Sequence, residues 1–188
     1  MSTNIRKLCR NSPLFRIFVV QIFLIIAYDK NITACFTGHR SYRGECKDAL
    51  LDAVRALYKE GYRTFLCGMA VGFDLAAAEA VLELRNELPE ITLDAIVPFE
   101  GMERKFSEGD KVRFRKILAN ADKVVTLAPR YSVELYSVRN NFLVDNSSAV
   151  IAYFDGSKGG TAYTVRRAIK QLHRYINLYI SPQQVILF

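Results

Sequence analysis

The sequence predicts a single α/β domain in which helices cover both faces of a mainly parallel sheet. Between residues 31 and 180, short apolar runs alternate with longer segments whose apolar residues recur at helical spacing. Strands that alternate with helices form parallel sheets, because each crossover helix packs against the sheet that it connects. The chain of 188 residues, 51% of them hydrophobic, is long and apolar enough to bury one core.

The first half of the chain contains three expected strands and two expected helices. The strands are residues 31–36, 64–67 and 91–97. The first helix is residues 45–60, which carry apolar side chains at helical spacing and are followed by Gly61. The second helix begins at residue 71 or 73 and is expected to run to about residue 88, where Pro89 stops it.

The second half continues the alternation. Asp110 is the expected N-cap of a helix that ends near residue 120. A strand at 123–127, a helix at 134–147 and a strand at 149–154 follow. The last long helix is expected at 161–175, and residues 176–180 and 184–188 are expected to form short terminal strands.

The distribution of charge and the spacing of the cysteines argue against a nucleic-acid-binding, zinc-binding or disulfide-bonded protein. The net charge is +7, but residues 1–30 hold five basic residues and one acid, which leaves +3 for the rest. The basic balance therefore does not indicate nucleic-acid binding. The cysteines are Cys9, Cys35, Cys46 and Cys67, with no C-x-x-C pair. We expect no zinc or other metal site, no disulfide framework and a reducing, cytoplasmic location.

Residues 1–28 are a basic and apolar extension ahead of the domain at 29–188. The apolar run resembles the core of a signal peptide, but Gln21 interrupts it and it is shorter than the roughly 20 residues that span a bilayer. Three interpretations remain: a signal or membrane anchor, an apolar segment packed on the domain, or an upstream extension from a misplaced start codon. We favour the third, and a membrane partner is expected only if the extension is real.

Glycines follow three of the expected strands. They are Gly38 after the first strand, Gly68 and Gly72 after the second, and Gly156, Gly159 and Gly160 after the fifth. Carboxyl ends of parallel strands share one edge, so these loops should meet there and suit a phosphate at a helix N-terminus. Gly68 is expected to take backbone angles closed to other residues, and Gly72 to admit a close approach to the backbone. Neither G-x-G-x-x-G nor an ATPase P-loop is present.

A set of short motifs resembles the YpsA-like branch of the SLOG superfamily, which also contains the DprA/Smf and LOG-type proteins. The motifs, within residues 31–174, are Thr37-Gly38-His39-Arg40, C-G-M-A-V-G-F-D at 67–74, Pro98-Phe99-Glu100-Gly101, Ala121-Asp122, Arg139-Asn140 with Val144-Asp145, and Asp155-Gly156 with Gly159-Gly160-Thr161. The resemblance implies a Rossmann-like sheet that binds a nucleotide or nucleotide-derived ligand.

The resemblance also implies roles for individual residues. Arg40 would pair with a phosphate, Asp74 would accept hydrogen bonds from ribose hydroxyls, and Thr161 would donate to a phosphate. Each residue also has a purely structural alternative. Arg40 would lie in an exposed polar turn, Asp74 would complement the helix dipole as a first-turn acid, and Thr161 would belong to a simple N-cap. Tyr131, Tyr136 and Phe142 are expected to pack, and one of them or Phe99 is a candidate to face an adenine. The expected ligand-binding residues are Gly38, His39, Arg40, Gly68, Met69, Gly72, Asp74, Phe99, Arg139, Asn140, Gly159, Gly160 and Thr161.

Three functions compete on these residues: a binding or sensing module for a nucleotide derivative, a LOG-like N-glycosidase acting on nucleoside monophosphates, and a DprA-like single-strand DNA binder. LOG-type proteins carry P-G-G-x-G-T-x-x-E, and Thr164 stands here where that glutamate is expected. A hydroxyl cannot replace a carboxylate that moves a proton or stabilises an oxocarbenium ion, and the remaining alternative is that Asp74 or Asp145 supplies a relocated acid from another loop. We therefore expect binding without a catalytic residue, a small-molecule partner rather than nucleic acid, and leave a homo-oligomer open.

Overall fold

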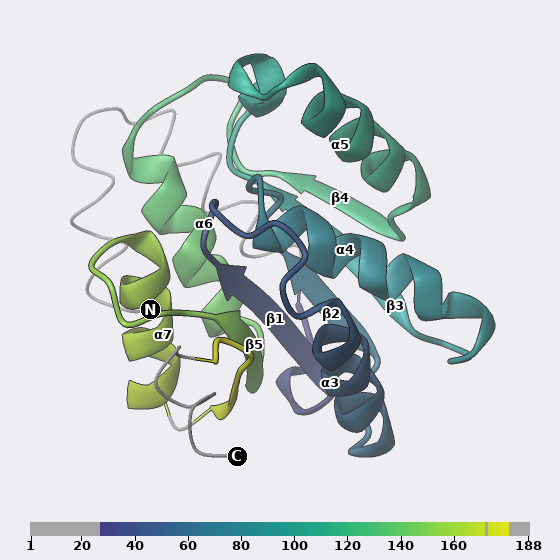
Figure 1. The fold of residues 1–188 in the computed structure, drawn as a ribbon. Coiled ribbons are helices and arrows are strands. Elements are labelled where there is room, and N and C mark those ends of the chain that lie inside the picture. The colour runs from purple at the N-terminus through teal and green to yellow at the C-terminus, as the bar shows by residue number, and fades with distance from the viewer. Residues whose placement is uncertain (1–26, 172, 181–188) are drawn as a thin grey trace.

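The computed structural model describes residues 27–171 and 173–180, which form one α/β domain around a six-stranded sheet (Figure 1). The strands are β1 Thr33–Gly38, β2 Thr64–Cys67, β3 Thr92–Val97, β4 Lys123–Thr126, β5 Ala149–Tyr153 and β6 Arg174–Asn177. They lie in the order β4-β3-β2-β1-β5-β6, and every adjacent pair is parallel. This confirms the predicted Rossmann-like fold class.

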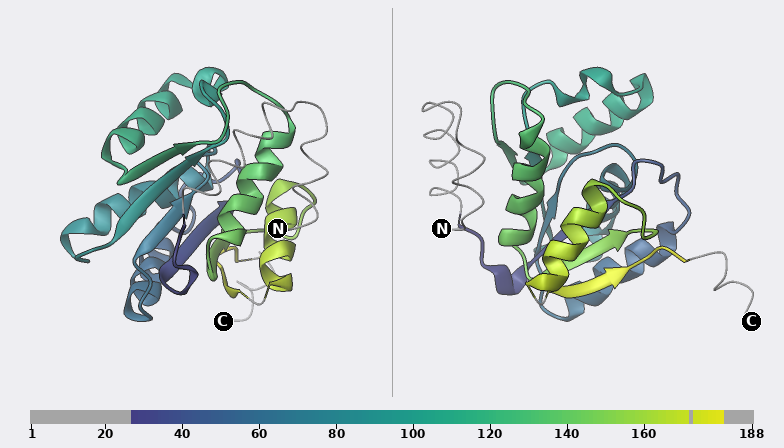
Figure 2. Two further views of the ribbon diagram at one scale, coloured as in Figure 1. Left: turned by 180° about the vertical axis from the view of Figure 1, so that it is seen from behind. Right: turned by 90° about the vertical axis from the view of Figure 1, so that its left-hand side faces the viewer.

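Helices cover both faces of the sheet (Figure 2). One face packs against α3 (Lys47–Lys59), α4 (Phe73–Glu83) and α5 (Glu108–Asn120), and the other against α6 (Glu134–Asp145) and α7 (Gly160–Lys170). Successive strand residues point to opposite faces, so Phe36 joins the core beneath α3 and α4, and its neighbour Cys35 joins the core beneath α6. Strands buried on both faces explain the continuous apolar runs in the sequence.

The strand expected at 176–180 lies at Arg174–Asn177, and three expected helix boundaries were wrong by three residues or more. Helix α4 ends at Glu83 and a 3-10 turn, Leu84–Asn86, carries the chain to Pro89. Helix α5 begins at Glu108, because the Ser107 side chain, not that of Asp110, accepts the N-terminal hydrogen bond. Helix α7 ends at Lys170, because residues 174–177 pair with β5 instead of continuing the helix to 175.

Parts of the sequence prediction lie outside the described residues. These are the extension up to residue 26 and the strand expected at 184–188. Within the described residues, none of the helices has the length and apolar character needed to cross a bilayer.

The strand order places a topological switch between β1 and β5. From β1 the chain proceeds outward through β2 and β3 to β4, and then returns to the other side of β1 to form β5 and β6. Helices α3 and α7, which follow β1 and β5, consequently lie on opposite faces of the sheet (Figure 1). In open parallel sheets, ligands bind at the carboxyl ends of the strands beside such a switch.

Tyr28, on the extension side of the expected boundary, lies against the domain. Its hydroxyl donates a 2.7 Å hydrogen bond to Asp94, and its ring meets that of Phe142 edge-on with centroids 6.1 Å apart. Burial raises the pKa of the Asp94 carboxyl, and the hydrogen bond from Tyr28 and the charge of Lys123 oppose that rise. Tyr28 therefore stabilises a carboxylate that is only 4% exposed.

Replacing Tyr28 with phenylalanine is expected to lower the free energy of unfolding by about 1–3 kcal/mol, because a buried acceptor loses its donor. The loss should shrink as the pH falls through the raised pKa of Asp94, since a protonated carboxyl gains less from the phenol. Urea unfolding at neutral and acidic pH measures both effects. Tyr58→Phe, which removes a solvent-exposed hydrogen bond to the Pro89 carbonyl, is the matched control and should change little.

Candidate functional site

A cavity of 290 Å³ lies at the switch between β1 and β5, and we call it the glycine cavity. Residues 37–40, at the end of β1 and directly after it, and residues 158–161 at the start of α7 form two of its walls. Asp74 from α4 and Arg139 and Asn140 from α6 contribute the remaining polar groups. The fold thus brings three loops from distant parts of the sequence to one place.

The N-terminus of α7 opens on this cavity. Its N-cap is Gly159, with φ of 147°, and no side chain among the described residues caps the helix. The first-turn N–H groups therefore keep their capacity to bind an anion. The Thr161 hydroxyl donates instead to the Gly38 carbonyl at 3.0 Å, which ties α7 to β1. A phosphate would meet the backbone of this turn rather than that hydroxyl.

His39 links the loops that follow β1 and β5. Its Nε2 lies 2.7 Å from Asp155 Oδ1, and its ring lies 5.8 Å from that of Phe154. Hydrogen bonds from Ser157, followed by the interaction with His39, hold the pKa of Asp155 below its ordinary value. His39 therefore contributes to the cavity wall through a contact that fixes the second loop.

Arg139 and Asp74 form a buried ion pair in the wall of the cavity. Arg139 Nη1 lies 3.3 Å from Asp74 Oδ2 and also donates to the Gly68 carbonyl, while the Ala70 N–H donates to Oδ2 at 3.2 Å. The two residues are 6% and 4% exposed. Burial raises the pKa of Asp74 and lowers that of Arg139, and their attraction opposes both shifts. Arg139 Nε is buried and has no hydrogen-bond partner within the described residues.

Two glycines allow close packing within the chain; the backbone angles expected for Gly68 were wrong, whereas the close approach expected at Gly72 is present. Gly68 is not left-handed; Met69 is, with φ of 61°. A side chain at Gly68 would overlap Arg139, so this glycine makes room for the guanidinium. Gly72 has φ of 82°, and an added Cβ there would lie 2.6 Å from the carbonyl oxygen of Arg40. The close approach at Gly72 is made by the loop after β1.

The glycine cavity gathers nine of the thirteen residues expected to bind a ligand. They are Gly38, His39, Arg40, Asp74, Arg139, Asn140, Gly159, Gly160 and Thr161. Of the other four, Gly68 and Met69 are packed beneath the wall, and Gly72 and Phe99 line neighbouring cavities. Sequence reasoning missed Lys158, a cation beside two glycines, and treated Tyr136 as packing, although both line the glycine cavity.

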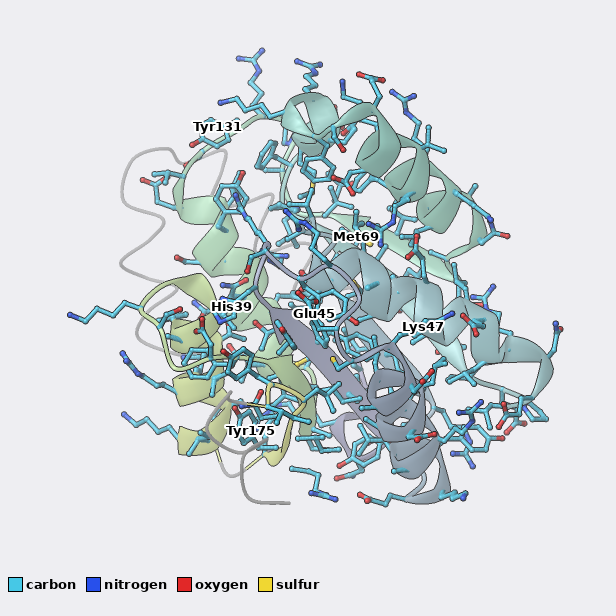
Figure 3. All side chains as sticks on the ribbon, viewed as in Figure 1. His39, Glu45, Lys47, Met69, Tyr131 and Tyr175 are labelled. Atoms are coloured by element: carbon cyan, nitrogen blue, oxygen red, sulfur yellow. The ribbon has the colours of Figure 1, made fainter. Side chains whose placement is uncertain are left out.

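Two larger cavities adjoin the glycine cavity, and Arg40 lines all three. The one beside α3 and α4 measures 860 Å³, but its main charges pair with each other, as Arg113 with Glu79 and Lys47 with Glu83. The other, of 710 Å³, is bordered by Phe99, Tyr131 and Tyr136, and we call it the aromatic cavity. Figure 3 shows Tyr131 in the loop before α6 and His39 beside α7.

Phe99 is packed rather than open. It is 6% exposed, and its ring meets those of Tyr131 and Tyr136 edge-on, at centroid distances of 5.1 and 5.8 Å. No group of three or more His, Cys, Asp and Glu side chains in the described part of the chain is arranged to hold a metal ion.

Comparison with known proteins agrees with this fold. The YpsA family model, described as the YspA SLOG family, matches residues 27–185. The chain belongs to the YpsA family. Among its relatives in the family, a UPF0398 protein of Bacillus thuringiensis (strain Al Hakam) is 30% identical over 151 residues, which are 76% of this chain and 82% of that protein. A UPF0398 protein of Bacillus cereus (strain G9842) is 29% identical over 175 residues, 89% of this chain and 95% of the relative.

Solved structures share the fold of this YpsA family member. DNA processing protein A from Streptococcus pneumoniae matches with a TM-score of 0.59 and 17% identity, covering 80% of this chain and 51% of that one. The Helicobacter pylori protein, whose structure concerns single-stranded DNA binding, matches with a TM-score of 0.58 and 18% identity, covering 79% of this chain and 66% of that one. This YpsA domain thus spans about half to two thirds of those chains, and the likeness shows the fold alone.

Proposed function

We propose that this protein binds a nucleotide or nucleotide-derived ligand in the glycine cavity, as a sensing or regulatory module. One observation carries the proposal: a helix N-terminus that no described side chain caps and a buried arginine, Arg139, whose Nε has no hydrogen-bond partner among the described residues, line the same cavity. Both groups favour an anion, and Arg40 and Lys158 add positive charge from two sides. The described cysteines, Cys35, Cys46 and Cys67, are free thiols, and we place this function in the reducing cytoplasm.

The cavity also offers an acceptor for a sugar. Asp74 Oδ2 is occupied by Arg139 and the Ala70 N–H, whereas Oδ1 makes no hydrogen bond within the described residues. Oδ1 is therefore the acceptor left for a ribose hydroxyl. Asn140, whose Nδ2 would lie 3.7 Å from a Cβ at Gly160, adds an amide beside the phosphate position.

Binding is favoured over cleavage of the ligand. Thr164, which stands at the position of the LOG-type glutamate, is fully buried and donates its hydroxyl to the Gly160 carbonyl at 2.9 Å. Among the described residues, Asp74 is the carboxylate that lines the glycine cavity, and Arg139 holds one of its oxygens. Cleavage of an N-glycosidic bond needs groups that stabilise the transition state more than the bound ligand. In this lining the Asp74 oxygens are committed, Oδ2 to Arg139 and Oδ1 to the proposed ribose contact.

Gly160→Asp is expected to abolish ligand binding, because it adds a carboxylate where a phosphate would lie. At about 100 times Kd, a ligand stabilises the wild-type fold by roughly 2.7 kcal/mol, which a thermal shift detects. Adenosine monophosphate and ADP-ribose are the first probes. Gly109→Asp is the matched control, since Gly109 also lies in the first turn of a helix with open space around it and lines none of the three cavities.

Two results would contradict this proposal. Equal shifts in wild type and Gly160→Asp would place the site elsewhere. Free base released from the monophosphate, detected by chromatography of the same samples, would make the protein a hydrolase, and dependence of that release on Asp74 would identify the relocated acid.

A further inference from the structure

The glycine cavity and the aromatic cavity are adjoining parts of one groove. Arg40, Ala70 and Tyr136 line both. The guanidinium carbon of Arg40 lies 5.6 Å from the centroid of the Tyr136 ring, within the range of a cation–π contact. Arg40 makes no ion pair with a described carboxylate, so its charge is available at the border between the two cavities.

The aromatic cavity presents an exposed ring that is held in place from behind. Tyr131 is 63% exposed, although its ring packs edge-on against buried Phe99 and lies 6.4 Å from that of Tyr136. A large aromatic side chain that is fixed by packing and still open to solvent suits the stacking of a planar group. Phe99 supplies the support, and the two tyrosines border the open space.

Cations without an ion-pair partner among the described residues line the aromatic cavity together with these rings. Arg104, Lys105 and Arg130 line the aromatic cavity and make no ion pair with any carboxylate of the described residues. The chain makes room for one of them: Gly101, with φ of 73°, has no Cβ, and an added one would lie 2.7 Å from Arg104 Nε. In the 860 Å³ cavity, by contrast, Arg113 and Lys47 are neutralised by glutamates.

The carboxylates that line the aromatic cavity do not neutralise its positive charge. Asp110 accepts from Ser107 and pairs with Arg113 at 3.1 Å, which leaves Glu100 as the other lining carboxylate. Four cations, including Arg40, therefore face one uncommitted acid. The groove as a whole has an anion site at α7, Tyr136 where the two cavities meet, and a second group of cations in the aromatic cavity.

We infer that the ligand is a nucleoside 3′,5′-bisphosphate. This rests on the proposed function, which places one phosphate at the N-terminus of α7. The base then stacks on the tyrosines, and the second phosphate meets Arg104, Lys105 and Arg130. A nucleoside monophosphate leaves those cations without a partner, and a nucleoside diphosphate places both phosphates on the same side of the sugar.

The test compares four adenosine ligands on the full chain by calorimetric titration. The 3′,5′-bisphosphate should bind at least tenfold more tightly than the 5′-monophosphate, the 3′-monophosphate or the diphosphate. Arg104→Gln with Arg130→Gln should remove that preference by weakening the bisphosphate at least tenfold, with a much smaller effect on the 5′-monophosphate, because both side chains lie outside the glycine cavity. Arg115→Gln with Lys116→Gln, two exposed cations of α5 that line none of the three cavities, should change neither affinity.

Each further outcome decides the inference. Equal affinity for the bisphosphate and the 5′-monophosphate overturns it but leaves the proposed function standing. A preference that survives in the Arg104 and Arg130 variant overturns the placement of the second phosphate. A 5′-phosphorylated adenosine oligonucleotide that binds more tightly than the bisphosphate, with affinity rising with length, replaces the small ligand by single-stranded nucleic acid. Absence of binding by every ligand removes both proposals.

Discussion

Arg139→Met is expected to lower the free energy of unfolding by about 3–5 kcal/mol, because it leaves Asp74 buried without its charge partner. In a domain of this size such a loss lowers the melting temperature by roughly 6–20 °C. Asp74 is 4% exposed, so water cannot replace the guanidinium. The substitution also removes the Arg139 donors from the glycine cavity, and the ligand-induced thermal shift should fall with it.

The double variant Arg139→Met with Asp74→Asn separates the charge from the packing. Asparagine keeps an oxygen that can accept from the Ala70 N–H and removes the uncompensated charge. We expect this variant to be more stable than Arg139→Met alone. A double variant that is no more stable would mean that Arg139 acts through its volume and its hydrogen bond to Gly68 rather than through the ion pair.

The loss in the free energy of unfolding caused by Arg139→Met should grow as the pH rises. Burial already raises the pKa of Asp74 in the folded protein, and removal of Arg139 raises it further. A group with a raised pKa stabilises the fold below its unfolded pKa of about 4 and loses that contribution as the pH rises through the folded pKa. The stability difference from wild type should therefore be largest at neutral pH and shrink toward pH 4, as denaturant titrations can measure.

Much of the fold could be predicted because the strands are buried on both faces. The expected limits of β2, residues 64–67, agree with the structure, and the other expected strands within the described residues were located to within a few residues. The helix ends were less predictable. Nothing local distinguishes residues 171–175 from helix, and it is the pairing of Arg174 with Ala149, far apart in the sequence, that ends α7 early.

The site was predictable as a set of loops but not as a set of contacts. Parallel strands bring their carboxyl ends together, which is enough to place Gly38, Asp74 and Gly160 near one another. The sequence does not reveal that Arg139 forms an ion pair with Asp74, or that the Thr161 hydroxyl donates a hydrogen bond to the Gly38 carbonyl. Such contacts depend on how α6 and α7 pack against the sheet, and the pattern of apolar residues in the sequence does not predict that packing.

Gly72→Ala is expected to destabilise the protein and to disrupt the glycine cavity in one step. A positive φ costs a non-glycine residue about 1–2 kcal/mol, and overlap with packed neighbours costs about 1–3 kcal/mol more. The neighbour here is the backbone carbonyl of Arg40, 2.6 Å from the added Cβ, and the adjacent His39 carbonyl accepts from the Phe73 N–H at 3.2 Å. Relief of the overlap must therefore move the loop that carries His39 and Arg40.

Gly61→Ala is the matched control for Gly72→Ala. Gly61 has φ of 102° but nothing within 4 Å of an added Cβ, so the substitution adds strain without overlap. We expect Gly61→Ala to lower the melting temperature by less than Gly72→Ala and to keep the full ligand-induced thermal shift with adenosine monophosphate. Gly72→Ala should lose most of that shift, because His39 and Arg40 both line the glycine cavity. Equal behaviour of the two variants would show that the close approach of the β1 loop to α4 does not position the site.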